Sequence, residues 1–135
     1  MKKFTIVTLT ALIISSASLY ANPITQQAND TFNLINETNF PLSIAINNVC
    51  SSEIGNISAH SNKTFATSQI VKACGDNDKC EILAFDDVKC LSNTIGGVTV
   101  DFKSHFMSVY SKRNTINITG TVNINNYSIS FSEIK

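Results

Sequence analysis

Apolar side chains occur at every second position through much of this chain, which is the spacing of a β-strand with one buried face. In residues 40–47 (FPLSIAIN) every even-numbered residue is a large apolar one, and the odd-numbered residues between them are smaller or polar. The same alternation covers residues 31–35, 98–103, 116–124 and 127–131. This period predicts half-buried strands rather than amphipathic helices.

Turn-forming residues separate these runs, as they do in folds made of many short strands. Residues 69–73 are the one stretch that predicts a helical turn, with Ser68 as its cap. The pattern therefore predicts an all-β fold of about seven or eight short strands. It would be a small antiparallel β-sandwich, or alternatively a barrel, in a single domain.

Two runs are apolar on both faces. Residues 79–86 (KCEILAFD) predict a central strand, and residues 106–110 (FMSVY) predict another. For the second run the alternative is an exposed apolar patch used for association. Between the strands, Gly96-Gly97 predicts a break, residues 60–63 a polar turn and Asn125-Asn126 a hairpin turn.

The N-terminus has the features of a secretory signal peptide. Lys2 and Lys3 precede the apolar run 4–14, and small residues lead to Ala21. The apolar run is shorter than the roughly 20 residues that a membrane span needs. We expect cleavage after Ala21, with cleavage after Ala17 as the fallback.

These boundaries divide the chain into a signal peptide (1–21), a flexible N-terminal arm (22–30) and one sandwich domain (31–135). The mature protein is expected to be periplasmic or secreted.

The charge balance excludes some partners. Ten Lys and Arg oppose ten Asp and Glu, and removal of Lys2 and Lys3 leaves eight against ten, a net charge of −2. Nucleic acid and anionic membrane surfaces both select for basic patches, so neither is expected as a partner. No second apolar segment of spanning length follows, so we expect no membrane insertion after signal cleavage. The mature protein is expected to be a monomer.

Four cysteines, Cys50, Cys74, Cys80 and Cys90, lie in the predicted domain. An even number in a small exported chain predicts two disulfides, for which three connectivities exist. A zinc site is the weaker alternative because no C-x2-C pair is present.

Strand geometry ranks the three connectivities. A strand over 79–86 would place Asp86 roughly 20 Å from Cys80, with Cys90 beyond that far end, whereas bridged Cα atoms lie within about 7 Å. If one strand separates the strands 40–49 and 79–86, these two run the same way, and Cys50 and Cys90 emerge at one end. We therefore favour Cys50–Cys90 with Cys74–Cys80.

Candidate catalytic groups are few. His60 and His105 are the only histidines, and neither has a nucleophile or a set of metal ligands near it in sequence. Asp101, Lys103 and His105 would share one face of a straight strand and could form a small polar site. The solvated face of an amphipathic strand is the better interpretation.

A calcium site is the remaining metal candidate. Asp76, Asn77 and Asp78 offer oxygen ligands, but they lack the full D-x-[DN]-x-[DN]-G spacing. We favour a polar turn closed by a disulfide, and we predict no metal, no cofactor and no catalytic residue. Lys112-Arg113 is interpreted as a solvated turn.

The Cys50–Cys90 pairing would bring two long connections, 51–61 and 86–97, to one end of the domain. Loops that a disulfide holds can present side chains with little ordering cost on binding. We predict partner contacts at Glu53, His60, Asp87 and Lys89. Alanine at these positions is expected to weaken binding and to leave thermal stability nearly unchanged.

Two segments carry a resemblance. Residues 32–48 (FNLINETNFPLSIAINN) and 80–90 (CEILAFDDVKC) resemble parts of small, largely uncharacterised exported β-sandwich proteins of Gram-negative bacteria. The first segment also has a faint likeness to the first hairpin of thaumatin-like proteins, although this chain is too short and has too few cysteines for that family. The resemblance implies an exported sandwich, and no residue role is transferred from either group.

These features predict an exported, non-enzymatic binding protein, such as a secreted effector, that acts on a protein or glycan of the environment or host. The alternative is a periplasmic or secreted inhibitor that inserts a loop into a foreign lysozyme or protease. An enzyme comes third, because catalytic residues can be scattered in sequence.

Overall fold

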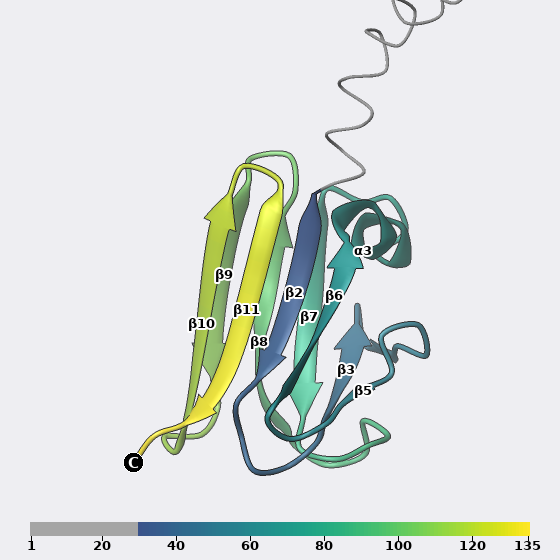
Figure 1. The fold of residues 1–135 in the computed structure, drawn as a ribbon. Helices are drawn as coiled ribbons and strands as arrows, with labels where there is room; N and C mark the ends of the chain where they lie inside the picture. The colour runs from purple at the N-terminus through teal and green to yellow at the C-terminus, as the bar shows by residue number, and fades with distance from the viewer. Residues whose placement is uncertain (1–29) are drawn as a thin grey trace, which may run out of the picture.

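The computed structural model describes residues 30–135, and the predicted signal peptide and residues 22–29 of the predicted arm lie outside the described residues. Within 30–135, ten strands and one short helix form two sheets that face each other (Figure 1). The elements are β2 (Thr31–Asn36), β3 (Leu42–Ile46), β4 (Val49–Cys50), β5 (Asn56–Ile57), β6 (Ser61–Ala66), α3 (Thr67–Ala73), β7 (Lys79–Phe85), β8 (Thr94–Asp101), β9 (Phe106–Ser111), β10 (Ile116–Asn123) and β11 (Asn126–Glu133). The predicted all-β fold is confirmed.

The first sheet has the order β10-β11-β2-β6. The last strand, β11, pairs with the first described strand, β2, in parallel, with Tyr127 opposite Phe32. The other two pairs in this sheet are antiparallel. The sheet is therefore mixed, which corrects the prediction of a purely antiparallel sandwich. Parallel neighbours need a long connection, and here most of the domain lies between them.

The second sheet has the order β4-β3-β7-β8-β9, and β5 pairs with β3. All its pairs are antiparallel. The strand that sequence predicted as central, β7, lies in the middle of this sheet. Its neighbour β3 is buried at all five residues despite its alternating sequence, because loop 86–93 covers the outward-facing Ser43.

The core lies between the sheets and takes the side chains that alternate inward. The first sheet contributes Phe32, Leu34, Ile129 and Phe131, and the second contributes Ile44, Ile82, Val98 and Val100. All eight are buried. The period-two pattern of the sequence is thus the pattern of core contacts.

The predicted strand 40–49 is interrupted. β3 ends at Ile46, and Asn47 and Asn48 both have positive φ, 49° and 70°. Asparagine tolerates this conformation better than most residues, and two such residues make a tight hairpin turn. The chain then returns as β4, with Cys50 opposite Ala45.

This hairpin changes the reason for the disulfide pairing. β3 and β7 are direct antiparallel neighbours, with Ser43 opposite Phe85; no strand separates them. Cys50 reaches Cys90 because the hairpin carries it back along β3, while the loop after β7 folds onto the same strand. The predicted pairs are confirmed, although the topology from which they were inferred is wrong.

Two local predictions, the turn at 60–63 and the helix cap at Ser68, are also corrected. β6 begins at Ser61, so residues 61–63 belong to an edge strand rather than to a turn. Helix α3 begins at Thr67, and Ser68 is not its cap. The side-chain oxygen of Gln69 instead accepts a 2.9 Å hydrogen bond from the N–H of Ala66.

The run 106–110 forms β9, an edge strand rather than a central one. Phe106 and Tyr110 remain exposed, at 61% and 38%. The predicted break at Gly96-Gly97 lies inside β8. A side chain at Gly96 would overlap the backbone of Tyr110 and the side chain of Ile118, so this glycine permits the close approach of neighbouring strands.

Candidate functional site

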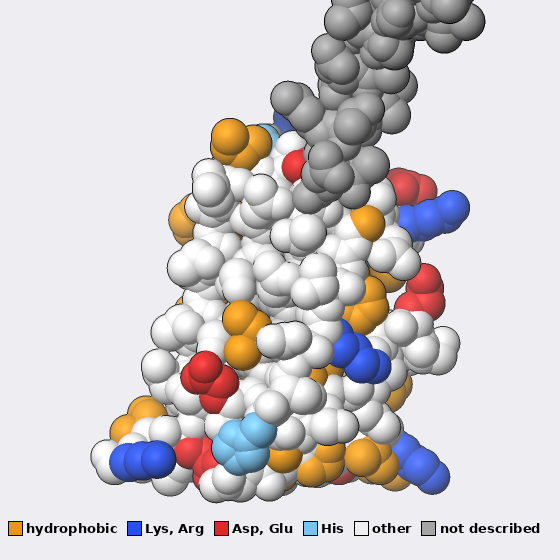
Figure 2. All heavy atoms as spheres, in the orientation of Figure 1, with side chains coloured by type: hydrophobic (Ala, Val, Ile, Leu, Met, Phe, Trp, Pro, Cys, Tyr) orange, Lys and Arg blue, Asp and Glu red, His pale blue; other side chains and the backbone are white. Residues whose placement is uncertain are grey.

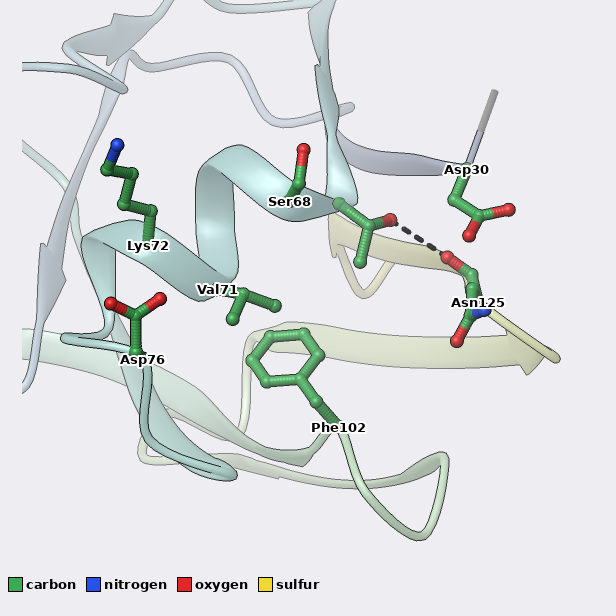
Figure 3. Close-up of a pocket in the computed structure, with 8 residues that line it drawn as sticks. Asp30, Ser68, Val71, Lys72, Asp76, Phe102 and Asn125 are labelled. Atoms are coloured by element: carbon green, nitrogen blue, oxygen red, sulfur yellow. Dashed lines mark hydrogen bonds between the residues drawn. The ribbon is translucent and has the colours of Figure 1, made fainter. Parts of the chain in front are cut away.

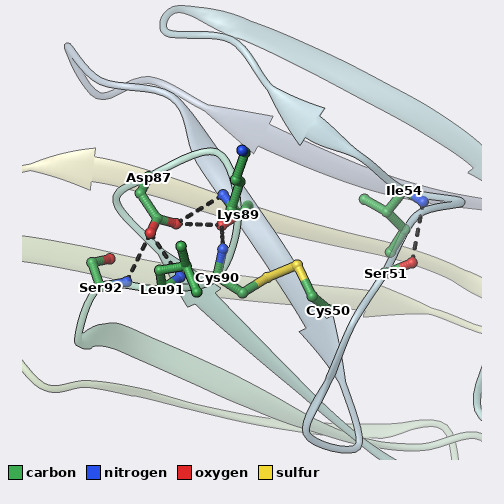
Figure 4. Close-up of a disulfide and its surroundings, with 9 residues drawn as sticks. Cys50, Ser51, Ile54, Asp87, Lys89, Cys90, Leu91 and Ser92 are labelled. Carbon is green, nitrogen blue, oxygen red and sulfur yellow. Dashed lines mark hydrogen bonds between the residues drawn. A yellow bond between two sulfur atoms is a disulfide. The ribbon is translucent and has the colours of Figure 1, made fainter.

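The loop that covers β3, residues 86–93, is held by the carboxylate of Asp87 (Figure 4). This carboxylate accepts hydrogen bonds from the hydroxyl of Ser43 at 2.8 Å and from the N–H groups of Leu91 and Ser92 at 2.7 Å each. The N–H of Lys89 donates a fourth bond at 3.2 Å. The hydroxyl of Ser43 also accepts a 2.8 Å bond from the N–H of Cys90. We call residues 86–93 the braced loop.

The electrostatics of the braced loop favour the ionised form of its acids. Burial acts to raise the pKa of Asp87, but the hydrogen bonds from Ser43 and from the loop N–H groups outweigh it and lower the pKa to about 2. The neighbouring Asp86 forms an ion pair with Arg113 at 2.7 Å. The hydrogen bond from Arg113 is the main cause that lowers the pKa of Asp86. Arg113 is therefore engaged with this loop, which corrects the prediction of a solvated Lys112-Arg113 turn.

The disulfide Cys50–Cys90 ties the braced loop to β4, with the two Cα atoms 5.8 Å apart. The second disulfide, Cys74–Cys80, lies buried between α3 and β7 with a Cα separation of 5.7 Å. Both lie within the range of ordinary disulfides. The braced loop is thus fixed covalently at one point and by hydrogen bonds at several others.

Large apolar side chains are exposed around the Cys50–Cys90 disulfide. Leu91 is 80% exposed and Val88 is 48% exposed on the braced loop, and Val49 is 69% exposed on β4. None of these three residues was among the contacts predicted from the sequence. The signal was present, because Val88 and Leu91 are apolar residues in a segment without strand periodicity, where they have no core to join.

The four predicted contact residues have different surroundings. Lys89 is exposed on the braced loop, and Glu53 is exposed in the turn that follows Cys50. Asp87 points into its own loop, as described above. His60 lies on the connection before β6, with its Nε2 atom 2.6 Å from the Oδ1 atom of Asn39.

His60 therefore faces the turn after β2 rather than the disulfide. It lines a shallow hollow of about 320 Å³ with the C-terminal residues, including Glu133. The chain connections at His60 and at the braced loop nevertheless emerge at the same end of the sandwich (Figure 1).

A larger hollow lies at the opposite end, beside α3 (Figure 3). Its volume is about 500 Å³, and it is lined by Asp30, Thr67, Ser68, Val71, Lys72, Asp76, Phe102 and Asn125. We call it the α3 groove. Its residues come from separate parts of the chain, so no local motif could have revealed it.

The predicted polar row Asp101, Lys103 and His105 does not form. β8 ends at Asp101, whose carboxylate accepts hydrogen bonds from the N–H groups of Lys103 and Ser104 at 3.0 and 3.1 Å. These residues form a turn. His105 is exposed, and its Nδ1 atom lies 3.5 Å from the hydroxyl of Tyr127.

The acidic turn 76–78 is built from internal hydrogen bonds. The side chain of Asn77 donates to the carbonyl of Cys74 at 2.9 Å, and the N–H of Asp76 donates to the carbonyl of Val71 at 3.1 Å. Among residues 30–135, no group of three or more His, Cys, Asp or Glu side chains is arranged to hold a metal ion. Acidic and basic side chains are scattered over the face seen in Figure 2, and neither sign gathers there.

Comparisons of the chain with models of known protein families, with curated proteins and with solved structures found no match. The resemblance to exported sandwich proteins therefore stays a prediction. No helix in the described part of the chain is both long enough and apolar enough to cross a membrane. The two disulfides are compatible with an oxidising compartment.

Proposed function

We propose that this chain is an exported, non-enzymatic binding protein that contacts a protein partner of the environment or host through the Cys50–Cys90 end. The observation that carries the proposal is the display of Leu91 and Val88 on a loop that Asp87 and the disulfide hold in place. Apolar side chains that find no place in the core are typical of an interaction surface.

Rigidity supports a role in binding. A loop that is ordered before it meets its partner loses little conformational entropy on association, so more of the contact energy appears as affinity. The braced loop has four hydrogen bonds to one carboxylate and a covalent link to β4. The conformational entropy of the loop is therefore lost when the protein folds rather than when it binds.

The shape and chemistry of this surface favour a protein partner over a glycan. The centre of a protein interface is apolar and loses its water on binding. Val88 and Leu91 offer such a centre, and the exposed Lys89 and Glu53 can form part of a polar rim. A glycan would instead require a concave site rich in donors and acceptors.

The test is affinity capture from envelope and host extracts with the purified mature protein as bait. Leu91→Ser removes the most exposed side chain of the surface, and Ile124→Ser is the matched control. Ile124 is 71% exposed on the β10–β11 turn, at the other end of the sandwich. We expect a partner whose affinity falls about tenfold or more with Leu91→Ser and stays unchanged with Ile124→Ser.

If the partner binds Leu91→Ser as tightly as the wild type but binds Ile124→Ser more weakly, the contact surface lies at the opposite end of the sandwich. Turnover of a substrate by the purified protein would refute the non-enzymatic part of the proposal.

An inhibitor of a foreign lysozyme or protease is the second candidate. It is favoured by one observation, namely that Leu91 is exposed on a loop braced by both a disulfide and a carboxylate. Such a loop can enter an active-site cleft without losing its shape. Inhibition of a panel of lysozymes and serine proteases by the wild type, and its loss in Leu91→Ser, would establish this candidate.

A further inference from the structure

The two sheets end on the same side of the sandwich in the edge strands β10 and β9, which lie over each other (Figure 1). Proteins commonly protect a sheet edge with charges, prolines, bulges or very short strands, because its unpaired backbone groups can pair with another chain. β10 has eight residues, no charge, no proline and an unbroken register with β11. In contrast, the edge strand β6 carries Lys63, and β4 has only two residues. Within residues 30–135, the side formed by β10 and β9 is therefore the least protected edge.

The hydrogen bonds of Ile116 show which backbone groups of β10 face the free edge. Its N–H donates to the carbonyl of Arg113 at 3.1 Å, and its carbonyl accepts from the hydroxyl of Ser111 at 2.8 Å, so neither group is used by β11. In an antiparallel ladder this direction alternates from residue to residue. The remaining residues of β10 whose backbone groups point away from β11 are Ile118, Gly120 and Val122. They offer a row of donors and acceptors to a further strand.

The sequence of β10 is complementary to itself. Residues 117–123 read NITGTVN in one direction and NVTGTIN in the other, so that only Ile and Val exchange places. A second copy of the strand, antiparallel and centred on Gly120, would place Thr119 opposite Thr121 and asparagine opposite asparagine. Such like-with-like polar pairs stabilise a sheet. A dimer with a twofold axis uses the same patch of both copies, which requires this kind of self-complementarity.

The backbone groups fit the same register. Gly120 would lie opposite Gly120 of the second copy, and Ile118 opposite Val122. All of these residues point their N–H and carbonyl groups to the free edge, so each outward donor would meet an outward acceptor. No charged side chain lies within β10 to oppose its own copy.

The position of Gly120 also places β9 relative to the axis. A side chain at Gly120 would overlap Met107 and lie close to Val109, so this glycine lies against the two residues that flank Ser108. A twofold axis that passes through Gly120 at right angles to the sheet would therefore pass near Ser108 in the second sheet. The edges of β9 in the two copies would then come side by side as well.

β9 has side chains suited to that arrangement. Residues 106–110 read FMSVY, so an axis near Ser108 brings Phe106 of one copy next to Tyr110 of the other. Phe106 is 61% exposed and Tyr110 is 38% exposed in a single chain. Aromatic pairs across neighbouring strands are favourable, and association would remove both rings from water.

We propose that two copies of the mature protein form a dimer in which β10 pairs with β10 antiparallel about a twofold axis at Gly120. The first sheet continues from one copy into the other, and the edges of β9 adjoin beneath it. This dimer replaces the monomer expected from the sequence. It uses a lateral edge of the sandwich, whereas the braced loop lies at one end, so the proposal does not rest on the proposed function.

The experiment is sedimentation velocity of the mature protein from about 1 µM to about 200 µM, which spans the range of weak and moderate dimers. We expect the mass of two chains at the upper end and the mass of one chain on dilution. Three double variants at exposed positions test the register. Thr119→Lys/Thr121→Lys places lysine opposite lysine across the axis, and Thr119→Lys/Thr121→Glu places lysine opposite glutamate. Asn62→Lys/Thr64→Lys adds the same two charges to β6, at the other edge of the sheet.

The variant with lysine at both positions of β10 is expected to dimerise about tenfold or more weakly, because like charges oppose each other twice. The lysine–glutamate variant and the β6 control are expected to dimerise as the wild type does. Amide exchange followed by NMR gives a second readout. The N–H groups of residues 118, 120 and 122 should exchange more slowly in the wild type than in the weakened variant, while those of residues 119 and 121, which bond to β11, should differ little.

Four outcomes would overturn the proposal. The first is the mass of a single chain at every concentration, and the second is a dimer that the two lysines in β10 do not weaken. The third is equal weakening by the lysine–glutamate variant or by the β6 control. The fourth is a dimer in which the amides of residues 118, 120 and 122 gain no protection.

Discussion

Asp87 shows how much structure one side chain can carry. Its carboxylate accepts four hydrogen bonds and connects the braced loop to Ser43 of β3. Asp87→Ala was expected from the sequence to leave thermal stability nearly unchanged, but the loss of these bonds predicts a lower stability. The role could not be predicted from sequence, because Ser43 is 44 residues away and only the fold brings the two together.

The low pKa of Asp87 predicts a dependence of stability on pH. The pKa is about 2 in the folded chain against an ordinary value of 3.8, so the ionised carboxylate stabilises the fold above pH 3.8. This contribution falls as the pH approaches 2. Thermal unfolding of the wild type and Asp87→Asn should show the wild type more stable at pH 7, with a difference that shrinks below about pH 4.

A difference that stays constant from pH 7 to pH 2 would show that the charge of Asp87 contributes nothing to the loop. Ser43→Ala is the companion variant, because it removes the hydroxyl that bridges Asp87 and Cys90. We expect this variant to lower the free energy of unfolding by about 1–3 kcal/mol at pH 7.

Asn36 is a second polar residue whose role depends on distant partners. It is buried at the end of β2, and its amide N–H group donates to the carbonyls of Phe40 and Ile57 at 2.8 and 3.1 Å. Its oxygen accepts from the N–H and the hydroxyl of Thr38. The amide thus joins the turn after β2 to β5.

Asn36→Asp should destabilise the fold by about 3 kcal/mol or more, because a carboxylate oxygen would face carbonyl oxygens in a buried site. Asn33→Asp, on the partly exposed outer face of the same strand, is the matched control and should cost less than about 0.5 kcal/mol. Urea unfolding measures both values. Equal losses would contradict the role assigned to the amide of Asn36.

At the scale of elements, the β10–β11 hairpin shows where a local turn rule fails. The sequence favours a turn at Asn125-Asn126, but Asn123 pairs with Asn126 and the turn residues are Ile124 and Asn125. This register keeps Tyr127, Ile129 and Phe131 buried. A shift by one residue would turn all three outward, so core burial overrides the preference of asparagine for turns.

This register places Ile124 in the turn, where it is exposed and has a φ of 58°. A β-branched residue is strained in that conformation. Ile124→Gly should therefore raise the free energy of unfolding by about 1 kcal/mol. Val49→Gly, at an exposed strand residue, should lower it by about 0.5–1 kcal/mol.

Urea unfolding of the two glycine variants decides the matter. If Ile124→Gly destabilises the protein as Val49→Gly does, the positive φ at Ile124 carries no strain.

Strand periodicity predicted most of the elements because a half-buried strand alternates apolar and polar residues along its own sequence. It could not predict the order of the strands. β9 and β7 both carry apolar residues on their two faces, yet β9 lies at an edge and β7 in the centre of the sheet. The pairing of β11 with β2 is likewise invisible locally, because it joins opposite ends of the domain.

At the scale of the whole molecule, the two disulfides close loops of very different length. Cys50–Cys90 spans 40 residues and Cys74–Cys80 spans 6. Loop-closure entropy gives roughly 4 kcal/mol for the first and about 2 kcal/mol for the second. Cys50→Ser/Cys90→Ser should therefore lower the free energy of unfolding by about 4 kcal/mol in urea titrations.

The disulfide variant should also bind the partner more weakly, because the braced loop would then lose conformational entropy when it binds. A loss of stability below about 1 kcal/mol would mean that the unfolded chain gains little freedom when this bridge is absent.

The candidate sites lie at the two ends of the sandwich, where the connections gather. The Cys50–Cys90 end could be predicted from the sequence because two long loops meet there, whereas the α3 groove could not. The loop lengths are visible in the sequence. The groove depends on the packing of α3 against the turn after β8, which no local pattern encodes.

The central claim is that the braced loop is the surface that contacts a protein partner. Hydrogen–deuterium exchange of the mature protein, with and without the captured partner, tests it most directly. We predict that binding slows exchange at residues 86–93 and 49–53 and leaves residues 67–76 and 102–105 unchanged. Protection confined to residues 67–76 and 102–105, with none in the braced loop, would contradict the claim.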